Sequence, residues 1–196
     1  CMKASLEKGE VVTLPHVNTI ADGTAVQTPG EHIFPYLQEN LDDVITIDDD
    51  ELIVAFLDMV ENHKMIVENS GLLTVAALKH LGVKDKRVVS ILSGGNMDVI
   101  TMSSVVQQGL IFRDRIFTVS VLLPDKPGEL VRVASIIAEE QGNVIKLDHN
   151  QFISTNRYAA VELKVTLEAY GTDHKKKIVK ALEEAGCKPK IIRANL

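Results

Sequence analysis

The order of apolar patterns after residue 114 constrains the fold more than any other feature of this 196-residue chain. Alternating stretches rich in β-branched residues predict strands, and apolar residues spaced by three and four predict helices. In chain order these patterns give a strand over Ile116–Leu123, a helix with Leu130, Val133, Ile136 and Ile137 on one face, strands over Val144–Phe152 and Tyr158–Leu167 around a hairpin turn at Ser154–Arg157, a helix over Thr172–Ala185 and a strand over Lys190–Arg193. The order β-α-β-β-α-β is that of a ferredoxin-like sandwich.

The first 114 residues follow a different pattern. Helix starts are predicted at Thr28–Glu31, a capping box, and at Asp48–Glu51, where acidic residues favour the first turn. A further helix over Ser70–Leu81 ends at Gly82, and another reaches Phe112. Between them, strands are expected at Val11–Leu14, Val44–Ile47 and, as a buried strand, Val88–Leu92. This alternation of helices and strands is typical of α/β layers.

Charge divides the chain at the same place. Residues 1–114 carry 8 Lys and Arg against 17 Asp and Glu, a net charge of −9. Residues 115–196 carry 13 against 10, a net charge of +3. We therefore predict two domains, over 1–114 and 115–196, with the boundary at the charged stretch Arg113-Asp114-Arg115.

Composition excludes several classes of protein. Hydrophobic residues make up 45% of the chain and charged residues 24%, as in a soluble globular protein. The densest apolar patch, Leu52–Leu57, is far too short to cross a membrane. A net charge of −6 argues against a nucleic-acid partner. Two cysteines, Cys1 and Cys187, do not make a disulfide framework, so we expect a cytoplasmic location.

Common catalytic and metal-binding motifs are absent from the sequence. The six histidines are scattered, with no HxH, HxxxH or cysteine pair, so no metal site is predicted. The sequence also lacks GxSxG, GxGxxG and P-loop motifs, which excludes hydrolase-elbow, Rossmann and Walker interpretations.

One tetrapeptide, Ser93-Gly94-Gly95-Asn96, follows the expected strand over Val88–Leu92. A glycine pair at a strand end lets the backbone approach a ligand closely, and such ends are where α/β folds place their sites. The Ser93 hydroxyl would offer a neutral partner to a ring nitrogen. On these four residues alone, a simple turn is the preferred interpretation.

Three ordered segments together resemble one enzyme family. They are Thr19–Gly23, then Val67-Glu68 followed by the Ala-rich stretch Ala76–Leu78, then Ile91–Asp98. The chain up to about residue 110 is similar to the C-terminal half of the threonine ammonia-lyases. These are pyridoxal-phosphate enzymes of the tryptophan-synthase-β fold type. The resemblance implies that the parent protein converts threonine or serine, threonine giving 2-oxobutanoate and ammonia.

The same resemblance implies three cofactor-binding residues. Ser93 would contact the pyridine nitrogen of pyridoxal phosphate, with Gly94 beside it, and Glu68 would lie next to the ring. A neutral hydroxyl makes the ring a moderate electron sink, which suits elimination of a β-hydroxyl group. The residues after Glu68, Asn69-Ser70-Gly71, depart from the family's usual Pro-Ala-Gly or Gly-Ala-Gly.

Other parts of the family pattern are missing. No Ser-aromatic-Lys-x-Arg-Gly motif, which carries the cofactor-bound lysine in the family, occurs in the chain. The substrate loop and the Gly-rich phosphate cradle, both upstream in the family, are also absent. The chain starts at Cys1 rather than Met. We therefore expect a C-terminal piece of a longer lyase, with no catalytic residue of its own and no activity alone.

The octapeptide Leu123–Leu130 resembles the opening loop of an ACT domain, a small amino-acid-sensing module. The resemblance implies an effector site, for which isoleucine, valine, another ligand and no ligand all stay open, and pairing with a second copy into a homo-oligomer. The helix that starts at Glu129 offers free backbone N–H groups for a carboxylate. The effector site would comprise Asp125, Gly128, Glu129, Leu130 and Asn143.

The predicted fold class is therefore α/β: the C-terminal part of a fold-type II pyridoxal-phosphate catalytic domain, followed by a ferredoxin-like βαββαβ ACT domain. Its partners would be a small amino-acid substrate and effector. Two alternatives stay open. One is a stand-alone amino-acid-binding and dimerising module without catalysis, which the missing lysine motif favours for this polypeptide. The other is a serine racemase-like enzyme, against which the ACT-like loop argues. Biosynthetic and catabolic roles are equally open.

Overall fold

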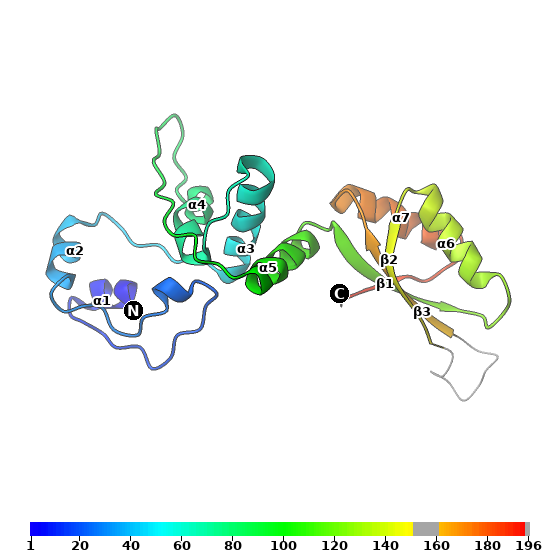
Figure 1. The fold of residues 1–196 in the computed structure, drawn as a ribbon, viewed down its shortest axis with the longest axis horizontal. Helices are drawn as coiled ribbons and strands as arrows, with labels where there is room; N and C mark the ends of the chain where they lie inside the picture. Colours follow the sequence, from blue (N-terminus) through cyan, green and yellow to red (C-terminus); the bar gives the residue numbers. More distant parts are fainter. Residues whose placement is uncertain (151–160, 195–196) are drawn as a thin grey trace. The chain divides into compact units, whose positions relative to one another are not determined.

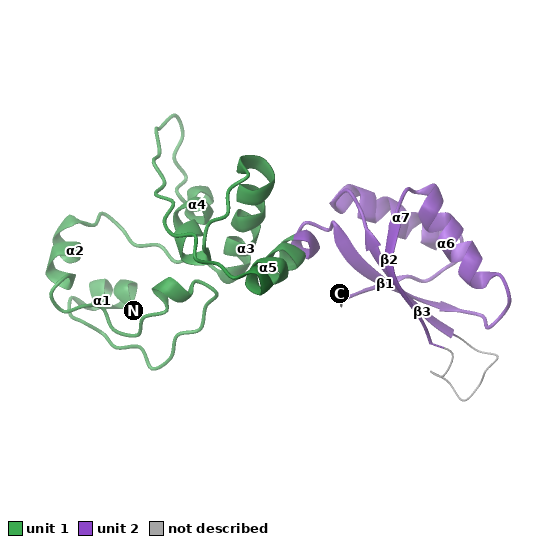
Figure 2. Cartoon of the chain, viewed as in Figure 1, with its two compact units in different colours: residues 1–109 green, residues 110–196 purple. Residues whose placement is uncertain are grey.

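The computed structural model describes residues 1–150 and 161–194. The chain forms two compact units, Cys1–Gly109 and Leu110–Leu196 (Figure 2). The charge pattern placed the boundary after residue 114, whereas the two units meet inside helix α5 (Val99–Phe112). The last residues of α5, Leu110–Phe112, belong to the second unit. The structural division therefore lies a few residues before the change in charge.

The first unit is made of short helices and extended chain. Its helical elements are α1 (Met2–Lys8), η1 (Asp22–Thr24), α2 (Phe34–Asn40), α3 (Asp49–Asp58), η2 (Met59–His63), η3 (Asn69–Leu72), α4 (Leu73–Ala76), η4 (Ala77–His80) and α5. Its core forms where α3 meets the chain around α4 and α5, with Leu52, Phe56 and Leu72 fully buried.

Helix α3 confirms the start predicted from the acidic run. Asp48 and Glu51 form a capping box, in which the Asp48 backbone N–H donates to Glu51 Oε2 over 3.1 Å. Lys79 Nζ lies 2.6 Å from Glu51 Oε1 and lowers the pKa of this carboxyl to about 2. Its neighbour Asp49 accepts hydrogen bonds from Thr19 Oγ1 and the Ile20 backbone N–H, over 2.6 and 3.1 Å. The start of α3 therefore fixes the segment around residue 20.

The expected strands of the first unit are wrong. Residues 1–109 are all described, and they contain no strand. Val11–Leu14, Val44–Ile47 and Val88–Leu92 lack regular structure, and Val89 and Ile91 in the last of them are exposed. A strand requires a hydrogen-bonded neighbour along its length, and the three segments make only one backbone–backbone hydrogen bond within residues 1–109, from the Leu14 N–H to the Gln27 carbonyl over 2.9 Å.

Two helix predictions also change. The helix expected to start at Thr28 begins at Phe34, with Pro35 in its first turn, where a missing backbone N–H does no harm. The helix expected over Ser70–Leu81 is divided into η3, α4 and η4, although its path stays helical.

The second unit shows the element order predicted for it. Its elements are β1 (Ile116–Leu123), α6 (Glu129–Glu139), β2 (Asn143–Asn150), β3 (Val161–Glu168), α7 (Thr172–Glu184) and β4 (Lys190–Ile192). The sheet has the order β2-β3-β1-β4, and every pair in it is antiparallel. The expected turn at Ser154–Arg157 lies outside the described residues.

Helices α6 and α7 cover one face of this sheet (Figure 1). Between helices and sheet lies a core in which strand residues meet α6 and α7: Phe117, Val119, Val121, Leu123, Leu163, Val165 and Leu167 from the strands, and Val133, Ile137, Ile178 and Leu182 from the helices. Helix α6 has an apolar and a polar face, as its predicted stripe requires.

The start of the second unit is tied to α7 by one side chain. Asp114 Oδ1 lies 2.6 Å from Lys175 Nζ, and Thr172 Oγ1 donates to Asp114 Oδ2 over 2.8 Å. The Lys175 ammonium holds the pKa of the Asp114 carboxyl below its usual range. Asp114 adopts a left-handed backbone conformation, with φ 54°.

Candidate functional site

Three separate segments of the first unit meet at one place. The three segments are residues 19–23, 67–71 and 93–98. Asn69 Nδ2 donates to the Ile20 carbonyl over 3.0 Å, which joins the first segment to the second. The Glu68 backbone N–H donates to the Gly94 carbonyl over 3.3 Å, and the Asn96 backbone N–H donates to Glu68 Oε2 over 3.2 Å. Glu68 is therefore held against the Gly94–Asn96 backbone.

Two glycines allow this close contact. A Cβ atom at Gly71 would lie 1.7 Å from the Ser93 carbonyl oxygen. A Cβ atom at Gly94 would lie 2.1 Å from Glu68 Cδ, and Gly94 also has a positive φ of 76°. Any side chain at either position would push the segments apart.

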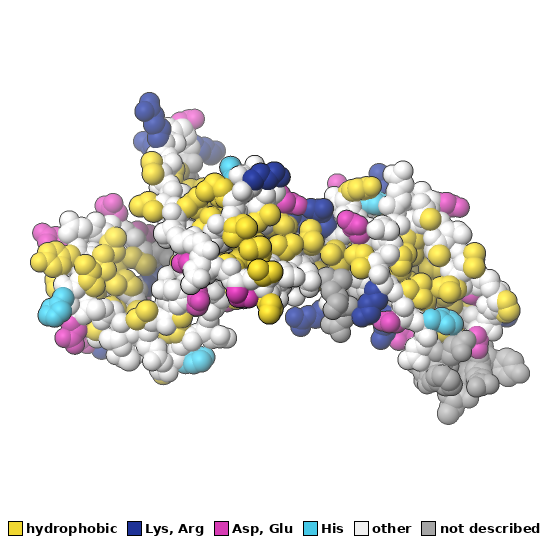
Figure 3. All heavy atoms as spheres, in the orientation of Figure 1, with side chains coloured by type: hydrophobic (Ala, Val, Ile, Leu, Met, Phe, Trp, Pro, Cys, Tyr) yellow, Lys and Arg dark blue, Asp and Glu magenta, His cyan; other side chains and the backbone are white. Residues whose placement is uncertain are grey.

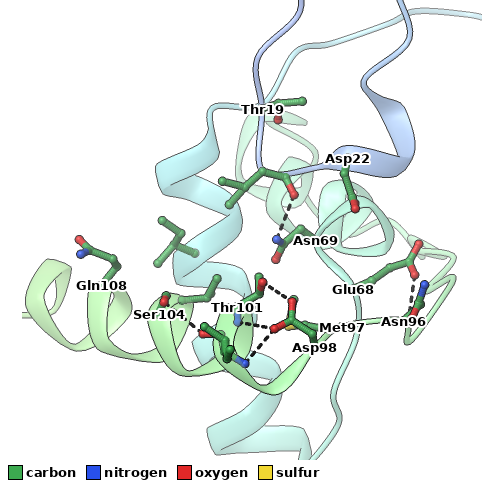
Figure 4. A pocket seen from close by; sticks show the side chains of 14 residues that line it. Thr19, Asp22, Glu68, Asn69, Asn96, Met97, Asp98, Thr101, Ser104 and Gln108 are labelled. Atoms are coloured by element: carbon green, nitrogen blue, oxygen red, sulfur yellow. Dashed lines mark hydrogen bonds between the residues drawn. The ribbon is translucent and has the colours of Figure 1, made fainter.

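The three segments border a cavity of about 480 Å³ (Figure 4). Helix α5 forms another part of its wall. The lining residues from the three segments are Thr19, Ile20, Asp22, Glu68, Asn69, Asn96, Met97 and Asp98. Of the residues predicted to bind the cofactor, Glu68 lines this cavity and Gly94 contacts Glu68. Ser93 is exposed and is not part of the lining.

Sequence reasoning missed several residues of this cavity. Asn69 is buried, and its Oδ1 has no hydrogen-bond partner among the described residues, as is also true of Ser70 Oγ. Asp98 caps α5, because its Oδ1 accepts the Ile100 and Thr101 backbone N–H groups over 2.9 and 3.0 Å. The Thr101 hydroxyl also binds this carboxylate and lowers its pKa. An Asp before an apolar run is a helix-start signal that would have located this residue.

A second candidate site lies in the second unit, at the loop between β1 and α6. The loop borders a cavity of about 320 Å³, lined by Leu123–Leu130 together with His149 of β2. Four of the predicted effector residues, Asp125, Gly128, Glu129 and Leu130, are brought together there. Gly128 is the N-cap of α6, with φ 95°, and a Cβ at this position would meet no atom within 4 Å.

Asn143, the fifth predicted effector residue, does not line this cavity. It pairs across the sheet with Glu168, and its Nδ2 donates to Glu168 Oε2 over 3.2 Å. The Glu129 carboxylate is also engaged, since Arg132 Nη2 and Nε donate to its Oε2 over 2.7 and 3.1 Å. What this loop offers a ligand is thus backbone together with the side chains of Asp125, Lys126 and His149.

Comparison with known proteins first shows which class of enzyme the first unit resembles. Residues 1–94 match the sequence model of the family described as pyridoxal-phosphate dependent enzyme. This match implies pyridoxal phosphate as cofactor. Among the described residues, no group of three or more His, Cys, Asp or Glu side chains is placed to bind a metal ion.

Individual relatives narrow this similarity, since the chain is similar over most of its length to threonine ammonia-lyases. It is 35% identical over 184 residues to an L-threonine ammonia-lyase of Geobacter sulfurreducens, covering 93% of this chain and 46% of that protein. It is 30% identical over 192 residues to an L-threonine ammonia-lyase of Thermotoga maritima, covering 97% and 48%. A solved structure of the processed threonine deaminase isoform 2 from Solanum lycopersicum is 32% identical, with a TM-score of 0.52 over 55% of this chain and 32% of that one.

The chain thus spans about half the length of the curated relatives it matches. In the part of the chain that the structure describes, no helix is both long and apolar enough to cross a membrane.

The residues present fit one edge of the implied cofactor. The Ser93 hydroxyl is exposed, and a hydroxyl group can bind a ring nitrogen, whereas the space beside Gly94 is occupied by the Glu68 carboxylate. The buried polar atoms Asn69 Oδ1 and Ser70 Oγ lie beside Glu68 and have no partner among the described residues, which suits a site completed by a polar ligand.

Proposed function

We propose that this chain is the C-terminal part of a pyridoxal-phosphate-dependent threonine and serine ammonia-lyase, which converts threonine to 2-oxobutanoate and ammonia. One observation carries the proposal. The three segments that resemble this family, separated by dozens of residues in the sequence, converge on Glu68 and its cavity. The similarity to the Geobacter sulfurreducens enzyme over 93% of the chain supports the same activity.

The roles of the chain's own residues follow from their positions. When bound, pyridoxal phosphate supplies an electron sink for removal of the β-hydroxyl group. Ser93 offers the ring nitrogen a neutral hydroxyl, which limits the strength of that sink. Glu68 is oriented by the Asn96 N–H and pressed against Gly94, so its carboxylate has one direction in which to face a ligand.

The Ser93 role is tested in the intact enzyme. Ser93→Ala should weaken cofactor retention and lower turnover by an amount on the order of 1–3 kcal/mol, the cost of leaving the ring nitrogen of the bound cofactor without its hydrogen-bond partner. Ser103→Ala on the exposed side of α5 is the matched control. Unchanged cofactor content and turnover in Ser93→Ala would rule out the role.

We further propose that the chain by itself is not a lyase, since it lacks the family's lysine motif. Mixing the purified chain with pyridoxal phosphate should leave the visible absorbance of the cofactor unchanged. Threonine should then give no 2-oxobutanoate. Robust turnover by the purified chain would overturn this part of the proposal.

For the second unit we propose an ACT domain that binds a small aliphatic amino acid. The β-α-β-β-α-β order with sheet order β2-β3-β1-β4 is that of a ferredoxin-like sandwich, which supports the assignment. The cavity lies at the start of α6, where the backbone N–H groups of the first turn and the helix dipole favour a carboxylate, although the Glu129 N–H donates to the Lys126 carbonyl over 3.4 Å. Strand β2 is an exposed sheet edge with Val144, Ile145 and Leu147 accessible, which supports pairing with a second copy.

Thermal melting of the chain with isoleucine, valine, threonine and lysine tests the effector site. Isoleucine or valine should raise the melting point, because a ligand at a hundredfold excess over its Kd adds about 2.7 kcal/mol to the folded state. Lysine should not. Gly128→Leu should abolish the shift, whereas Gly186→Leu should keep it. Both glycines have positive φ and open space around a Cβ, so they share the backbone strain, but Gly186 lies outside the loop cavity.

A stand-alone sensing and dimerising module is the second candidate function. It is favoured by the complete core of the second unit and by the missing lysine motif. An effector-induced shift, combined with no lyase activity after the rest of the catalytic domain is supplied, would select this alternative.

A further inference from the structure

Helices α6 and α7 of the second unit are tied together at both ends. At one end, Arg132 Nη1 of α6 donates to the carbonyl of Ala185, the C-cap of α7, over 2.9 Å. At the other end, His174 in the first turn of α7 accepts the Tyr170 N–H at Nδ1 over 3.0 Å, which leaves Nε2 as the protonated nitrogen. His174 Nε2 then donates to the carbonyl of Glu140, the C-cap of α6, over 2.6 Å. We call these two tied helices the helix pair.

The helix pair is also packed along its length. Val133 and Ile137 of α6 are at most 1% exposed and share one buried cluster with Ile178 and Leu182 of α7. Close-packed interiors have low compressibility, so a shift of one helix is passed to the other.

The start of the helix pair borders the loop cavity proposed for the effector. Glu129 and Leu130, the first two residues of α6, line this cavity. The Glu129 carboxylate accepts hydrogen bonds from Arg132, the same guanidinium that reaches the Ala185 carbonyl. One side chain therefore joins a wall of the effector cavity to the far end of α7.

The first turn of α7 holds the end of α5. Lys175 Nζ and Thr172 Oγ1 bind the two carboxylate oxygens of Asp114, over 2.6 and 2.8 Å. The Asp114 and Arg115 N–H groups donate to carbonyls of the last turn of α5, over 3.0 and 2.8 Å. Glycine is the usual residue at such a left-handed helix end, so the bonds from α7 stabilise Asp114 there. Helix α5 also supplies residues that line the Glu68 cavity: Ile100, Thr101, Ser104, Val105 and Gln108.

We propose that the helix pair and Asp114 form a relay, through which an amino acid in the loop cavity stabilises the end of α5. This inference rests on the proposed effector site. The relay has two states, one with Asp114 held by α7 and one with Asp114 released and the last turn of α5 open. A ligand that orders the loop at Glu129 also orders Arg132, which positions α7, and so favours the held state.

Hydrogen exchange at the Asp114 and Arg115 amides tests the relay. The purified chain is saturated with isoleucine or valine, whichever raises its melting point more. In the parent, exchange at these amides should slow by about fivefold or more, the lower end of typical coupling between two sites. Lys175→Ala should remove this slowing, while the amino acid still raises the melting point. Lys176→Ala is the matched control and should keep the slowing, since its Nζ lies 4.0 Å from Asp173 and its side chain is 74% exposed.

A second pair of variants tests the other end of the relay. Arg132→Met removes the bonds to Glu129 and Ala185, and should reduce the slowing by about twofold or more. Lys180→Met on α7, whose Nζ lies 3.3 Å from the exposed Glu184 carboxylate, should leave the slowing unchanged. On the face shown in Figure 3, the charged side chains of the second unit are scattered rather than gathered in one patch, so the two variants differ in the bonds they remove more than in the overall field.

The outcomes separate the relay from the effector site. Unchanged or faster exchange in the parent, at a concentration at which the amino acid raises the melting point, overturns the relay and leaves the effector site in place. Slowing in Lys175→Ala or Arg132→Met equal to that in the parent also overturns the relay. If Lys175→Ala loses its cooperative melting, Asp114→Asn takes its place and should likewise show no slowing. If no amino acid raises the melting point of the parent, the effector site is rejected and the relay with it.

Discussion

Similar stretches of sequence form a strand in the second unit and no regular structure in the first. Ile116–Leu123 and Val88–Leu92 are both short runs rich in β-branched residues. In the second unit such a run becomes β1, where Val119 and Val121 are fully buried between the sheet and its helices. In the first unit Val89 and Ile91 are exposed and form no strand. An apolar run specifies a strand only where the chain also supplies the neighbours.

The difference in burial between the two units corresponds to a difference in folding free energy. Full burial of a Val, Leu or Ile side chain stabilises a fold by about 1.5–3 kcal/mol. Strands β1 and β3 obtain this stabilisation within one chain, whereas Val89 and Ile91 do not. We expect the second unit to be the more stable of the two.

Truncating one residue in each unit should give the largest contrast. Leu163 is fully buried, so Leu163→Ala should lower the free energy of unfolding of the second unit by about 2–5 kcal/mol. Ile91→Ala, at a 72% exposed site, should change the first unit by about 0.5 kcal/mol or less. Hydrogen exchange resolved by peptide measures both units in one sample. Similar losses in the free energy of unfolding for Leu163→Ala and Ile91→Ala would contradict the difference in burial between the two units.

A pair of adjacent glycines should give an intermediate effect within the first unit. Gly94→Ala places a Cβ 2.1 Å from Glu68 Cδ at a positive φ, and should cost about 1–3 kcal/mol. Gly95→Ala is the control, because its nearest atom, the Ile66 carbonyl oxygen, is 3.9 Å away. Chemical denaturation of the two variants checks the difference. If both behave like the parent, the packing of Glu68 on Gly94 is looser than described.

The smallest effect is expected at the start of the second unit. Lys175 lowers the pKa of Asp114, so this carboxylate stabilises the unit above its unfolded pKa of about 3.9, and the contribution is lost as pH falls through the lower, folded pKa. Asp114→Asn should therefore cost about 1 kcal/mol or less at pH 7, and the difference from the parent should shrink toward pH 3.

The control for this variant is Asp173→Asn. Its side chain is 97% exposed and its oxygen lies 4.0 Å from Lys176 Nζ, so it should show no comparable pH dependence. A gap between parent and Asp114→Asn that widens in acid would contradict the sign of the argument. Hydrogen exchange in the first unit should not respond to either change.

The sequence predicted the secondary structure of the second unit better than that of the first. The bounds of β1 were predicted as Ile116–Leu123, because period-two patterning and in-chain neighbours agree there. Val88–Leu92 carried the same local signal, and its missing neighbours are not visible in that signal.

The candidate sites depended on contacts between distant residues. The resemblance named Glu68 and Gly94, but the link from Asn69 to Ile20 joins residues far apart in the chain and has no local pattern. His149 entered the effector cavity through the register of β2 on β3, and Asn143 was drawn to Glu168 by that same register. Local patterns do not fix cross-strand register, so His149 was missed and Asn143 was predicted at a site that it does not line.

The contact of Gly71 with the Ser93 carbonyl has a genetic consequence. Every codon change that replaces glycine by another amino acid adds a Cβ, and at this position any Cβ meets backbone 1.7 Å away. No missense allele at codon 71 is conservative, in contrast to codon 95, where φ is not positive and a Cβ would lie 3.9 Å from its nearest atom. In a saturation library selected for growth that depends on the proposed lyase activity, codon 71 should return only its synonymous glycine codons.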